Sequence, residues 1–265
     1  TASVDVRRAA GSAGGTLHVL AVGVTDYRDG DLKLKYAADD ALAIARRLAL
    51  RGGERFSGRV VTRTLTDREA TLTNIATTLT RMAASARPED TFVLFMAGHG
   101  TTLDDQYYFL PYELDYVNDQ SIRNEAVSQN QLRDWLSLLP VRSLLLLDTC
   151  RAGNVVQLAA RAGEEKGAFS KLIRLSNRAV IVASSNNTMA LEGHQGHGVF
   201  SWVVLDALDH ADYDENGSVE VTDIATHVRR LVPAITEEKF RYRQVPMQDT
   251  PGEPFAVAAP LPKGK

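Results

Sequence analysis

The chain has 265 residues, of which 44% are hydrophobic and 24% charged, as expected for a globular protein that can bury one sizeable core. The formal net charge of -3 gives no electrostatic reason to expect a nucleic-acid partner. The single cysteine excludes a disulfide scaffold, and no apolar run approaches the roughly 18 residues of a membrane span, so we expect a cytoplasmic protein with no membrane contact.

The composition along the chain predicts one domain between two short flexible ends. We expect residues 1–16 to be a lead-in or linker, 17–259 a single domain and 260–265 a tail. The first residues are small and polar and lack the apolar stretch of a signal peptide. The missing initiator methionine indicates a piece of a longer protein, or a processed or tagged product.

Apolar runs typical of buried strands alternate with segments of helical periodicity. The expected strands are 17–24, 59–65, 91–97, 144–147, 178–183 and 254–258, with a short hairpin arm at 106–110. The expected helices are 36–50, a helix with a capping-box start at 66–69 that runs to about 84, 130–138, 199–209 and 224–231. This alternation predicts an α/β fold with a mostly parallel sheet of about six strands and helices on both faces.

Two of these strands lead into residues that can carry acyl-transfer chemistry. Asp148 and Cys150 follow the apolar run 144–147, and His99 follows the run 91–97 between two glycines. Because neighbouring parallel strands end at one edge of a sheet, we expect the thiol and the imidazole to lie together. The imidazole would take the thiol proton, and the backbone N–H groups of Gly100 and Cys150 would face the developing oxyanion. Taken singly, either residue is more often a structural one; taken together, they predict a hydrolase with a cysteine nucleophile.

The two motifs resemble the His and Cys boxes of the caspase-like cysteine peptidases, clan CD, family C14. AGHG contains His99, and DTCRAG contains Cys150 about 50 residues later, as in caspases. Asp148 before the cysteine and Gly153 after it make the match closer to the metacaspase and orthocaspase branch of prokaryotic homologues than to animal caspases. The resemblance covers roughly residues 17–231 and implies the caspase-haemoglobinase fold, with Cys150 as nucleophile and His99 as general base. One departure is Ala97, where the family often has serine.

The resemblance also implies a pocket for a basic substrate residue. In the metacaspase branch, the aspartate before the nucleophile and another near the start of the first helix line a pocket for arginine or lysine. The matching residues are Asp148 and Asp40, with Asp39 beside the latter. Two carboxylates at the base of a cleft favour a guanidinium, which they can bind through paired hydrogen bonds. The alternative is that Asp39 and Asp40 only favour a helix N-terminus. Ser184 and Ser185, at the end of the fifth expected strand, are further candidates for lining the cleft.

The segment 154–176 follows the nucleophile strand and carries several basic residues. Caspase-like enzymes are commonly cut in this loop during activation, so we expect self-cleavage after Arg161 or Lys166. The alternative is an inert, solvated loop. A second Gly-His-Gly sequence surrounds His197, but it precedes a helix instead of ending an apolar strand, so His197 ranks below His99 as the general base.

An acidic loop, 212–223, matches the first part of an EF-hand calcium loop and lies between two expected helices. Its candidate ligands are Asp212, Asp214, Asn216, Ser218, Glu220 and Asp223. The twelfth position is an aspartate where a bidentate glutamate is usual, which predicts weak calcium affinity. The alternative is an ordinary acidic connector between helices. The peptidase chemistry itself requires no cofactor.

The expected partner is a protein or peptide substrate with arginine, or less often lysine, before the scissile bond (the P1 position). The resemblance also implies fusion to, or regulation by, a sensor domain. Two other classes stay open: a non-catalytic caspase-like binding module, and a calcium-binding sensor whose sheet is only a scaffold. A nucleotide-binding fold is disfavoured, because no glycine-rich dinucleotide motif follows the first strand and no P-loop is present.

Overall fold

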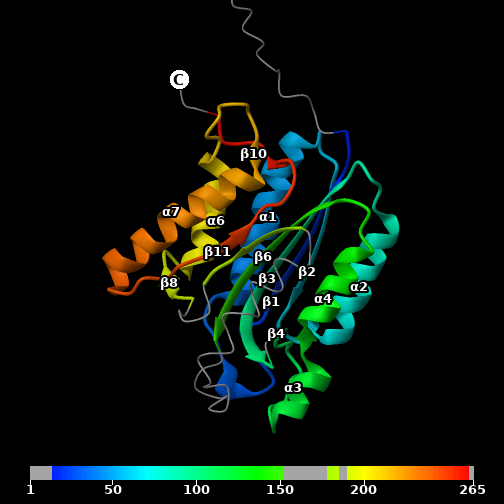
Figure 1. The fold of residues 1–265 in the computed structure, drawn as a ribbon, viewed down its shortest axis with the longest axis vertical. Helices are drawn as coiled ribbons and strands as arrows, with labels where there is room; N and C mark the ends of the chain where they lie inside the picture. The colour runs from blue at the N-terminus through cyan, green and yellow to red at the C-terminus, as the bar shows by residue number, and fades with distance from the viewer. Residues whose placement is uncertain (1–13, 105, 152–177, 185–189, 263–265) are drawn as a thin grey trace, which may run out of the picture.

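The computed structural model describes residues 14–104, 106–151, 178–184 and 190–262, with the backbone alone at 150 and 151. The strands of its main sheet are β1 Leu17–Gly23, β2 Val60–Thr66, β3 Thr91–Leu103, β4 Gln106–Phe109, β5 Val127–Ser128, β6 Arg142–Arg151, β7 Ala179–Val182 and β11 Met247–Asp249. The order across this sheet is β11-β7-β6-β3-β1-β2, with β4 and β5 attached at β3 (Figure 1). β2, β1, β3, β6 and β7 run parallel, which confirms the predicted mostly parallel sheet.

Helices cover both faces of this sheet (Figure 1). One face carries α1 Ala37–Arg55, α6 Val199–His210 and α7 Val221–Phe240. The other carries α2 Leu72–Ser85 and α4 Gln129–Ser137, with the short α3 Asp119–Glu125 beyond them. Two 3₁₀ turns, η1 Gly30–Leu32 and η2 Asp67–Glu69, follow β1 and β2. Among the described residues, no helix has the length and apolar character needed to cross a membrane.

The central strands read as continuous apolar runs because both of their faces are covered. Leu17, Val19 and Ala21 of β1 are buried against α1 and α6, and Leu20 and Val22 are buried against the α2 side. The alternation of side chains along a strand therefore sends successive residues into two separate apolar cores.

Two helix boundaries differ from the expected ones. α1 was expected to end near Gly52, but it continues to Arg55, because Gly52 packs under β1. A Cβ atom on Gly52 would lie 2.3 Å from Cδ2 of Leu17, so a glycine is needed inside the helix. The capping box expected at 66–69 is wrong: α2 begins at Leu72, and Thr71 caps it by accepting from the N–H of Asn74.

The C-terminal part also differs from the expectation. α7 passes through Pro233 and ends at Phe240 instead of near residue 231. The last strand, β12 Ala256–Ala258, pairs with β10 Val219–Glu220 in a separate small sheet and does not join the main one. β8 Glu192–His194 and β9 His197–Gly198 form a hairpin before α6. α3 and β11 were not predicted.

Candidate active site

The strands β3 and β6 are neighbours, and their register places His99 opposite Cys150. Parallel strands lie about 4.8 Å apart, so the two backbones approach each other closely at this pair. The sequence predicted that both residues follow their strands, but the structure places them within β3 and β6. β3 continues to Leu103 because β4 pairs with its last residues, and β6 continues to Arg151.

The imidazole of His99 is held by the backbone of η1. Its Nε2 lies 2.9 Å from the carbonyl oxygen of Leu32, and the His99 side chain is buried. A carbonyl oxygen can only accept a hydrogen bond, so we assign the proton of the neutral ring to Nε2. Nδ1 then carries the lone pair that a general base needs.

The backbone of His99 is fixed by Tyr27, in the loop after β1. The N–H of His99 donates to the Tyr27 hydroxyl over 2.7 Å, and the two ring centroids are 5.3 Å apart. Gly98 has φ of +152°, and a Cβ atom there would lie 2.7 Å from the same hydroxyl. The glycine before the histidine therefore makes room for this contact. Neither Leu32 nor Tyr27 was found from the sequence, although both lie in the loop that separates the first strand from the first helix.

The structure brings together the two aspartates expected in the substrate pocket. Asp40 lies in the first turn of α1, and Asp148 lies on β6, each with its side chain buried. Gly198 lies between them, because a Cβ atom on it would be 2.9 Å from Oδ2 of Asp148 and 3.1 Å from Oδ2 of Asp40. Ser201, on the first turn of α6, donates to Asp148 from its hydroxyl at 2.6 Å and from its N–H at 3.2 Å.

Burial is the main force that raises the pKa of both aspartates. It raises the pKa of Asp148 to about 7, helped by the nearby charges of Asp40 and Glu192. The pKa of Asp40 is also raised by burial, although hydrogen bonds from His197 and from the Gly198 N–H oppose this. Among the described residues, no arginine or lysine forms an ion pair with either carboxylate. The pair is therefore a buried acidic site to which a cation would be attracted.

His197 belongs to this acidic site. Its Nδ1 lies 2.5 Å from Oδ1 of Asp40, and that hydrogen bond raises the pKa of His197 above its ordinary value. His197, Ser201 and Glu192 were not identified as members of the site from the sequence, because they come from β8, β9 and α6, more than forty residues after Asp148. The glycine-rich turn before α6 is the signal that can locate them.

The other predicted site residues are placed as follows. Asp39 is exposed beside the buried Asp40. Ser184 is buried just after β7, and Ser185 lies outside the described residues, as do Arg161 and Lys166.

Gly100 is closely surrounded on its strand. It pairs with both β6 and β4, and a Cβ atom on it would lie 2.8 Å from the Tyr107 ring and 3.0 Å from the Thr149 hydroxyl. The role of Gly100 as an oxyanion donor stays a prediction.

The acidic loop lies between α6 and α7, and its carboxylates bind its own backbone. Asp212 accepts from the N–H groups of Asn216 and Gly217, and Asp223 accepts from the N–H of Glu220. Burial is the main cause that raises the pKa of Asp223 to about 6. Within the described part of the chain, no three His, Cys, Asp or Glu side chains form a group that could hold a metal ion.

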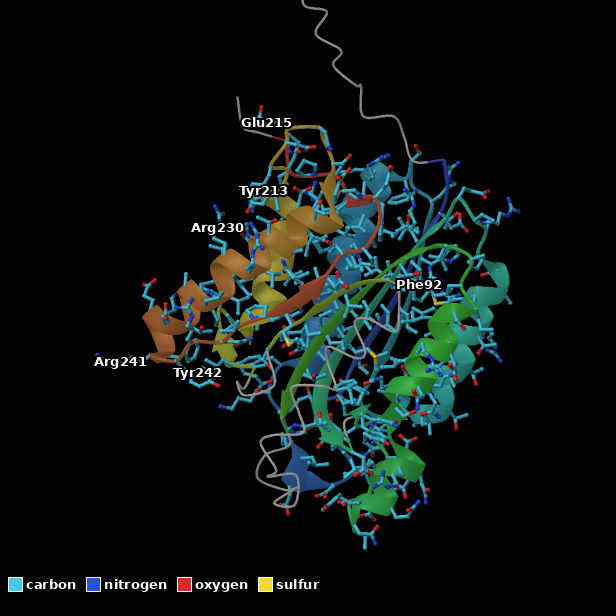
Figure 2. All side chains as sticks on the ribbon, viewed as in Figure 1. Phe92, Tyr213, Glu215, Arg230, Arg241 and Tyr242 are labelled. Atoms are coloured by element: carbon cyan, nitrogen blue, oxygen red, sulfur yellow. The ribbon has the colours of Figure 1, made fainter. Side chains whose placement is uncertain are left out.

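The acidic loop is also remote from β3 and β6, the strands that carry His99 and Cys150. It follows the C-terminal end of α6, whereas Ser201 is in the first turn of this helix, about 14 Å from its end at a rise of 1.5 Å per residue. In Figure 1, β10 and β4 lie near opposite ends of the molecule. Figure 2 shows Tyr213 and Arg230 side by side at the loop, with the guanidinium 5.5 Å from the ring centroid. Calcium binding at this loop stays a prediction.

The chain is similar to known proteins in sequence pattern and in fold. A family model described as the caspase domain of peptidase family C14 matches residues 16–252. The fold is similar to the crystal structure of a protein from Geobacter sulfurreducens, with a TM-score of 0.61, 18% sequence identity, and coverage of 91% of this chain and 95% of that chain. No curated protein sequence matches the chain. At this identity the structural likeness shows the fold alone.

Proposed function

Because the chain belongs to the caspase-domain family of C14 peptidases, which are cysteine peptidases, we propose that it is an endopeptidase that cleaves after arginine, or less often lysine. In this proposal Cys150 is the nucleophile, and His99 is first the general base and then the general acid. The observation that carries the specificity is the buried carboxylate pair Asp40 and Asp148 beside the strand ends that hold the dyad. Within the family, we place the chain nearest to the metacaspase branch.

The proposed reaction follows ordinary acyl-transfer chemistry. Nδ1 of His99 takes the thiol proton, and the Cys150 thiolate attacks the carbonyl carbon of the P1 residue. The imidazolium then gives its proton to the leaving amine, so the C–N bond breaks and an acyl-enzyme remains. A water molecule, deprotonated by the same imidazole, hydrolyses the thioester. The Leu32 carbonyl, which accepts from Nε2, supports the positive charge on the ring during each cycle.

The P1 side chain would be selected by charge. A guanidinium that enters the site would lose its bound water and form charge-assisted hydrogen bonds to Asp148 and Asp40 in its place. An aspartate side chain would be repelled by the same two carboxylates. Arginine is favoured over lysine because its planar fork can bind both carboxylates.

A panel of fluorogenic peptides tests this proposal. We expect cleavage after P1 arginine, weaker cleavage after lysine and none after aspartate, all abolished in Cys150→Ala. Asp40→Asn should lower kcat/KM for P1 arginine, whereas Asp39→Asn, at the exposed neighbouring position, should leave it nearly unchanged. Equal cleavage after aspartate and arginine would overturn the proposed specificity, and an inactive wild-type protein would favour a non-catalytic binding module.

We also propose two regulatory steps, self-cleavage and activation by calcium. Self-cleavage after Arg161 or Lys166 predicts two fragments of defined mass for the wild-type protein and an intact chain for Cys150→Ala. Calcium activation through the acidic loop predicts a rise in peptidase activity with calcium that is lost in Asp212→Asn. An intact wild-type chain, or an activity indifferent to calcium and chelator, counts against the respective step.

A further inference from the structure

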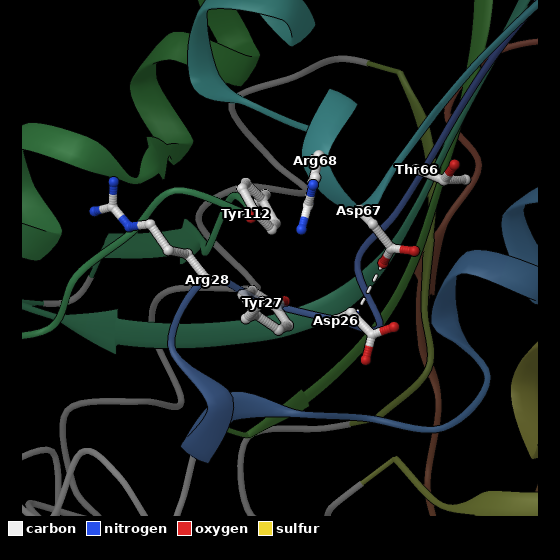
Figure 3. Close-up of a pocket in the computed structure, with 7 residues that line it drawn as sticks. All are labelled: Asp26, Tyr27, Arg28, Thr66, Asp67, Arg68 and Tyr112. Carbon is white, nitrogen blue, oxygen red and sulfur yellow. Dashed lines mark hydrogen bonds between the residues drawn. The ribbon is translucent and has the colours of Figure 1, made fainter.

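A hollow opens at the same edge of the sheet as His99 and Cys150, beyond the ends of β1 and β2. Its volume is about 570 Å³ (Figure 3). The lining residues are Asp26, Tyr27, Arg28, Thr66, Asp67, Arg68 and Tyr112. None of them belongs to the acidic pocket of Asp40 and Asp148, so this hollow is a separate feature of the molecule.

The walls of this hollow are tied together by hydrogen bonds between three chain segments. The N–H of Arg28 donates to the Tyr112 carbonyl over 3.1 Å, and the N–H of Tyr112 donates to the Ala70 carbonyl over 3.0 Å. Oδ1 of Asp67 accepts from the N–H groups of Thr25 at 2.8 Å and of Asp26 at 2.9 Å. These contacts close a ring of residues around the opening, so the hollow is preformed.

The backbone of Asp67 is strained where it closes this ring. Its φ is +46°, a left-handed conformation that residues other than glycine rarely adopt. Residues in such a conformation are concentrated at active sites and ligand-binding positions. This conformation turns the carboxylate toward the loop after β1, as the dashed contact to Asp26 in Figure 3 shows.

The lining of the hollow carries two aspartates and two arginines, and the four differ in the partners that hold them. The Asp67 carboxylate accepts two backbone hydrogen bonds, and Asp26 forms an ion pair with Lys33, whose Nζ is 2.6 Å away. Arg28 faces Asp115 at 4.0 Å and points away from the other lining side chains in Figure 3. Arg68 forms no ion pair with any residue that the structure describes, and Figure 3 shows it extending beside Tyr112 toward Tyr27. Among the charged residues of the lining, Arg68 is therefore the one whose guanidinium is available to an anionic group, with tyrosine rings beside it.

Tyr27 connects the hollow to the catalytic histidine. Its ring lines the hollow, while its hydroxyl accepts from the N–H of His99. In the proposed reaction, His99 must give a proton to the leaving amine, so the residues after the scissile bond pass beside the imidazole. Across the sheet, β6 with Cys150 is followed by β3 with His99 and then by β1 and β2, whose ends border the hollow. An extended peptide advances about 3.3 Å per residue, so the first two residues after the cut are the ones that reach this region.

We propose that this hollow is a subsite for an acidic side chain, aspartate or glutamate, at the first or second position after the scissile bond, with Arg68 as the specificity-determining residue. The proposal rests on the proposed function, because it uses the direction in which a cleaved peptide leaves His99. Arg68 is exposed, so we expect its effect on kcat/KM to be about fivefold. This effect should become smaller as the ionic strength increases.

The test uses internally quenched peptides with P1 arginine in which the first or second following residue is glutamate, glutamine or lysine. We expect the glutamate peptide to be cleaved about five times faster than the glutamine peptide, in kcat/KM, at low salt. This preference should disappear in Arg68→Gln, while cleavage of the glutamine peptide is unchanged. Arg63→Gln is the matched control, because Arg63 is an exposed arginine on β2, just before η2, and does not line the hollow.

The outcomes separate this proposal from the proposed function. Cleavage after arginine with no preference for glutamate, or with a preference for lysine, overturns the subsite and leaves the peptidase assignment intact. If no peptide is cleaved, the peptidase assignment fails, and the binding of the same peptides, labelled and measured by fluorescence anisotropy on Cys150→Ala, decides the subsite. Tighter binding of the glutamate peptide that requires Arg68 supports the acidic subsite, and equal binding of all three peptides overturns it.

Discussion

Asp148 is a buried carboxyl group that must be ionised to bind a guanidinium. Its pKa is raised to about 7, mainly by burial, so at neutral pH it is only partly ionised. We expect kcat/KM for a P1-arginine peptide to rise as the pH increases through about 7, because the ionised form of the pocket attracts the substrate. Asp148→Asn should lower kcat/KM by a factor on the order of 100 and remove this component of the pH profile.

The pH profile of the dyad itself must be separated from that of Asp148. Alkylation by iodoacetamide depends on ionisation of the thiol but not on the P1 pocket, so its rate on the same samples gives the profile of the dyad. The ratio of peptide cleavage to alkylation then isolates Asp148. A ratio that stays constant between pH 6 and pH 8 would contradict the role given to this residue.

Gly198 packs closely against both carboxylates of the acidic site. In Gly198→Ala the new methyl group would lie 2.9 Å from Oδ2 of Asp148 and 3.1 Å from Oδ2 of Asp40. We expect KM for P1-arginine peptides to increase by about tenfold, because the methyl group would push both carboxylates out of the positions from which they would bind a guanidinium. Gly53→Ala is the control, since a Cβ atom on Gly53 meets nothing within 4 Å. An unchanged KM in Gly198→Ala would mean that P1 binds elsewhere.

At the scale of secondary-structure elements, the apolar runs predicted β1, β2, β3, β6 and β7 because both faces of a central strand are covered. Element ends were predicted less well, because distant contacts decide them. α1 continues past Gly52 because that glycine packs against Leu17, and α2 starts late because Asp67 is needed by the loop after β1.

In the candidate site, too, residues that belong to a local pattern were predicted and residues that act through distant contacts were not. His99 and Cys150 were predicted from the strands that carry them, and Asp40 and Asp148 from a family resemblance. The Leu32 carbonyl, the Tyr27 hydroxyl and Ser201 were missed. They act through hydrogen bonds between residues far apart in the chain, and a local pattern of residue types does not encode such contacts.

Asp90 ties the starts of β1 and β3 together at the edge of the sheet opposite the site. Its carboxylate accepts from the N–H groups of Thr16 and Arg87 and contacts Nε2 of His18 at 3.1 Å. Burial acts to raise the pKa of Asp90, but these hydrogen bonds lower it overall. A carboxyl group whose pKa is lower in the folded state stabilises the fold above its unfolded pKa, and this stabilisation is lost as the pH falls through the folded pKa.

We therefore expect Asp90→Asn to reduce the free energy of unfolding by about 1–3 kcal/mol at pH 7, measured by urea denaturation, because buried hydrogen bonds to a charged acceptor are weakened. kcat should stay at the wild-type value, since Asp90 is at the other end of the strands. The difference in stability between the two proteins should shrink at acidic pH, where the wild-type carboxyl group is protonated. A stability equal to that of the wild type at pH 7 would show that the three contacts contribute little.

At the scale of the whole molecule, the two faces of the sheet supply different parts of the proposed substrate cleft. The face with α1 and α6 supplies the carboxylates for the P1 residue, and the η2 and α2 side supplies the hollow at Arg68. The dyad strands β3 and β6 lie between them. A substrate with a basic residue before the cut and an acidic residue after it would therefore use both faces at once.

If the proposed function holds, the buried carboxylate pair also links substrate binding to the stability of the whole fold. The pKa of Asp148 is about 7 in the folded protein and near 3.8 in the unfolded chain, so the folded state holds the extra proton between these values. The contribution of Asp148 to the free energy of unfolding therefore falls as the pH rises from about 4 to about 7. A bound cation should restore the lost stability, because the cation stabilises the ionised form of Asp148.

We expect benzamidine, a small amidinium ligand, to raise the Tm of the wild-type protein at pH 8 more than at pH 5.5. A ligand that binds only the folded state adds about 2.7 kcal/mol when its concentration is 100 times its Kd. Without ligand, Asp148→Asn should have a higher Tm than the wild type at pH 8, since it carries no buried charge, and benzamidine should no longer shift it. Sodium chloride at the same ionic strength is the control for general screening. An equal shift at both pH values, or a full shift in Asp148→Asn, would place the cation site away from this pocket.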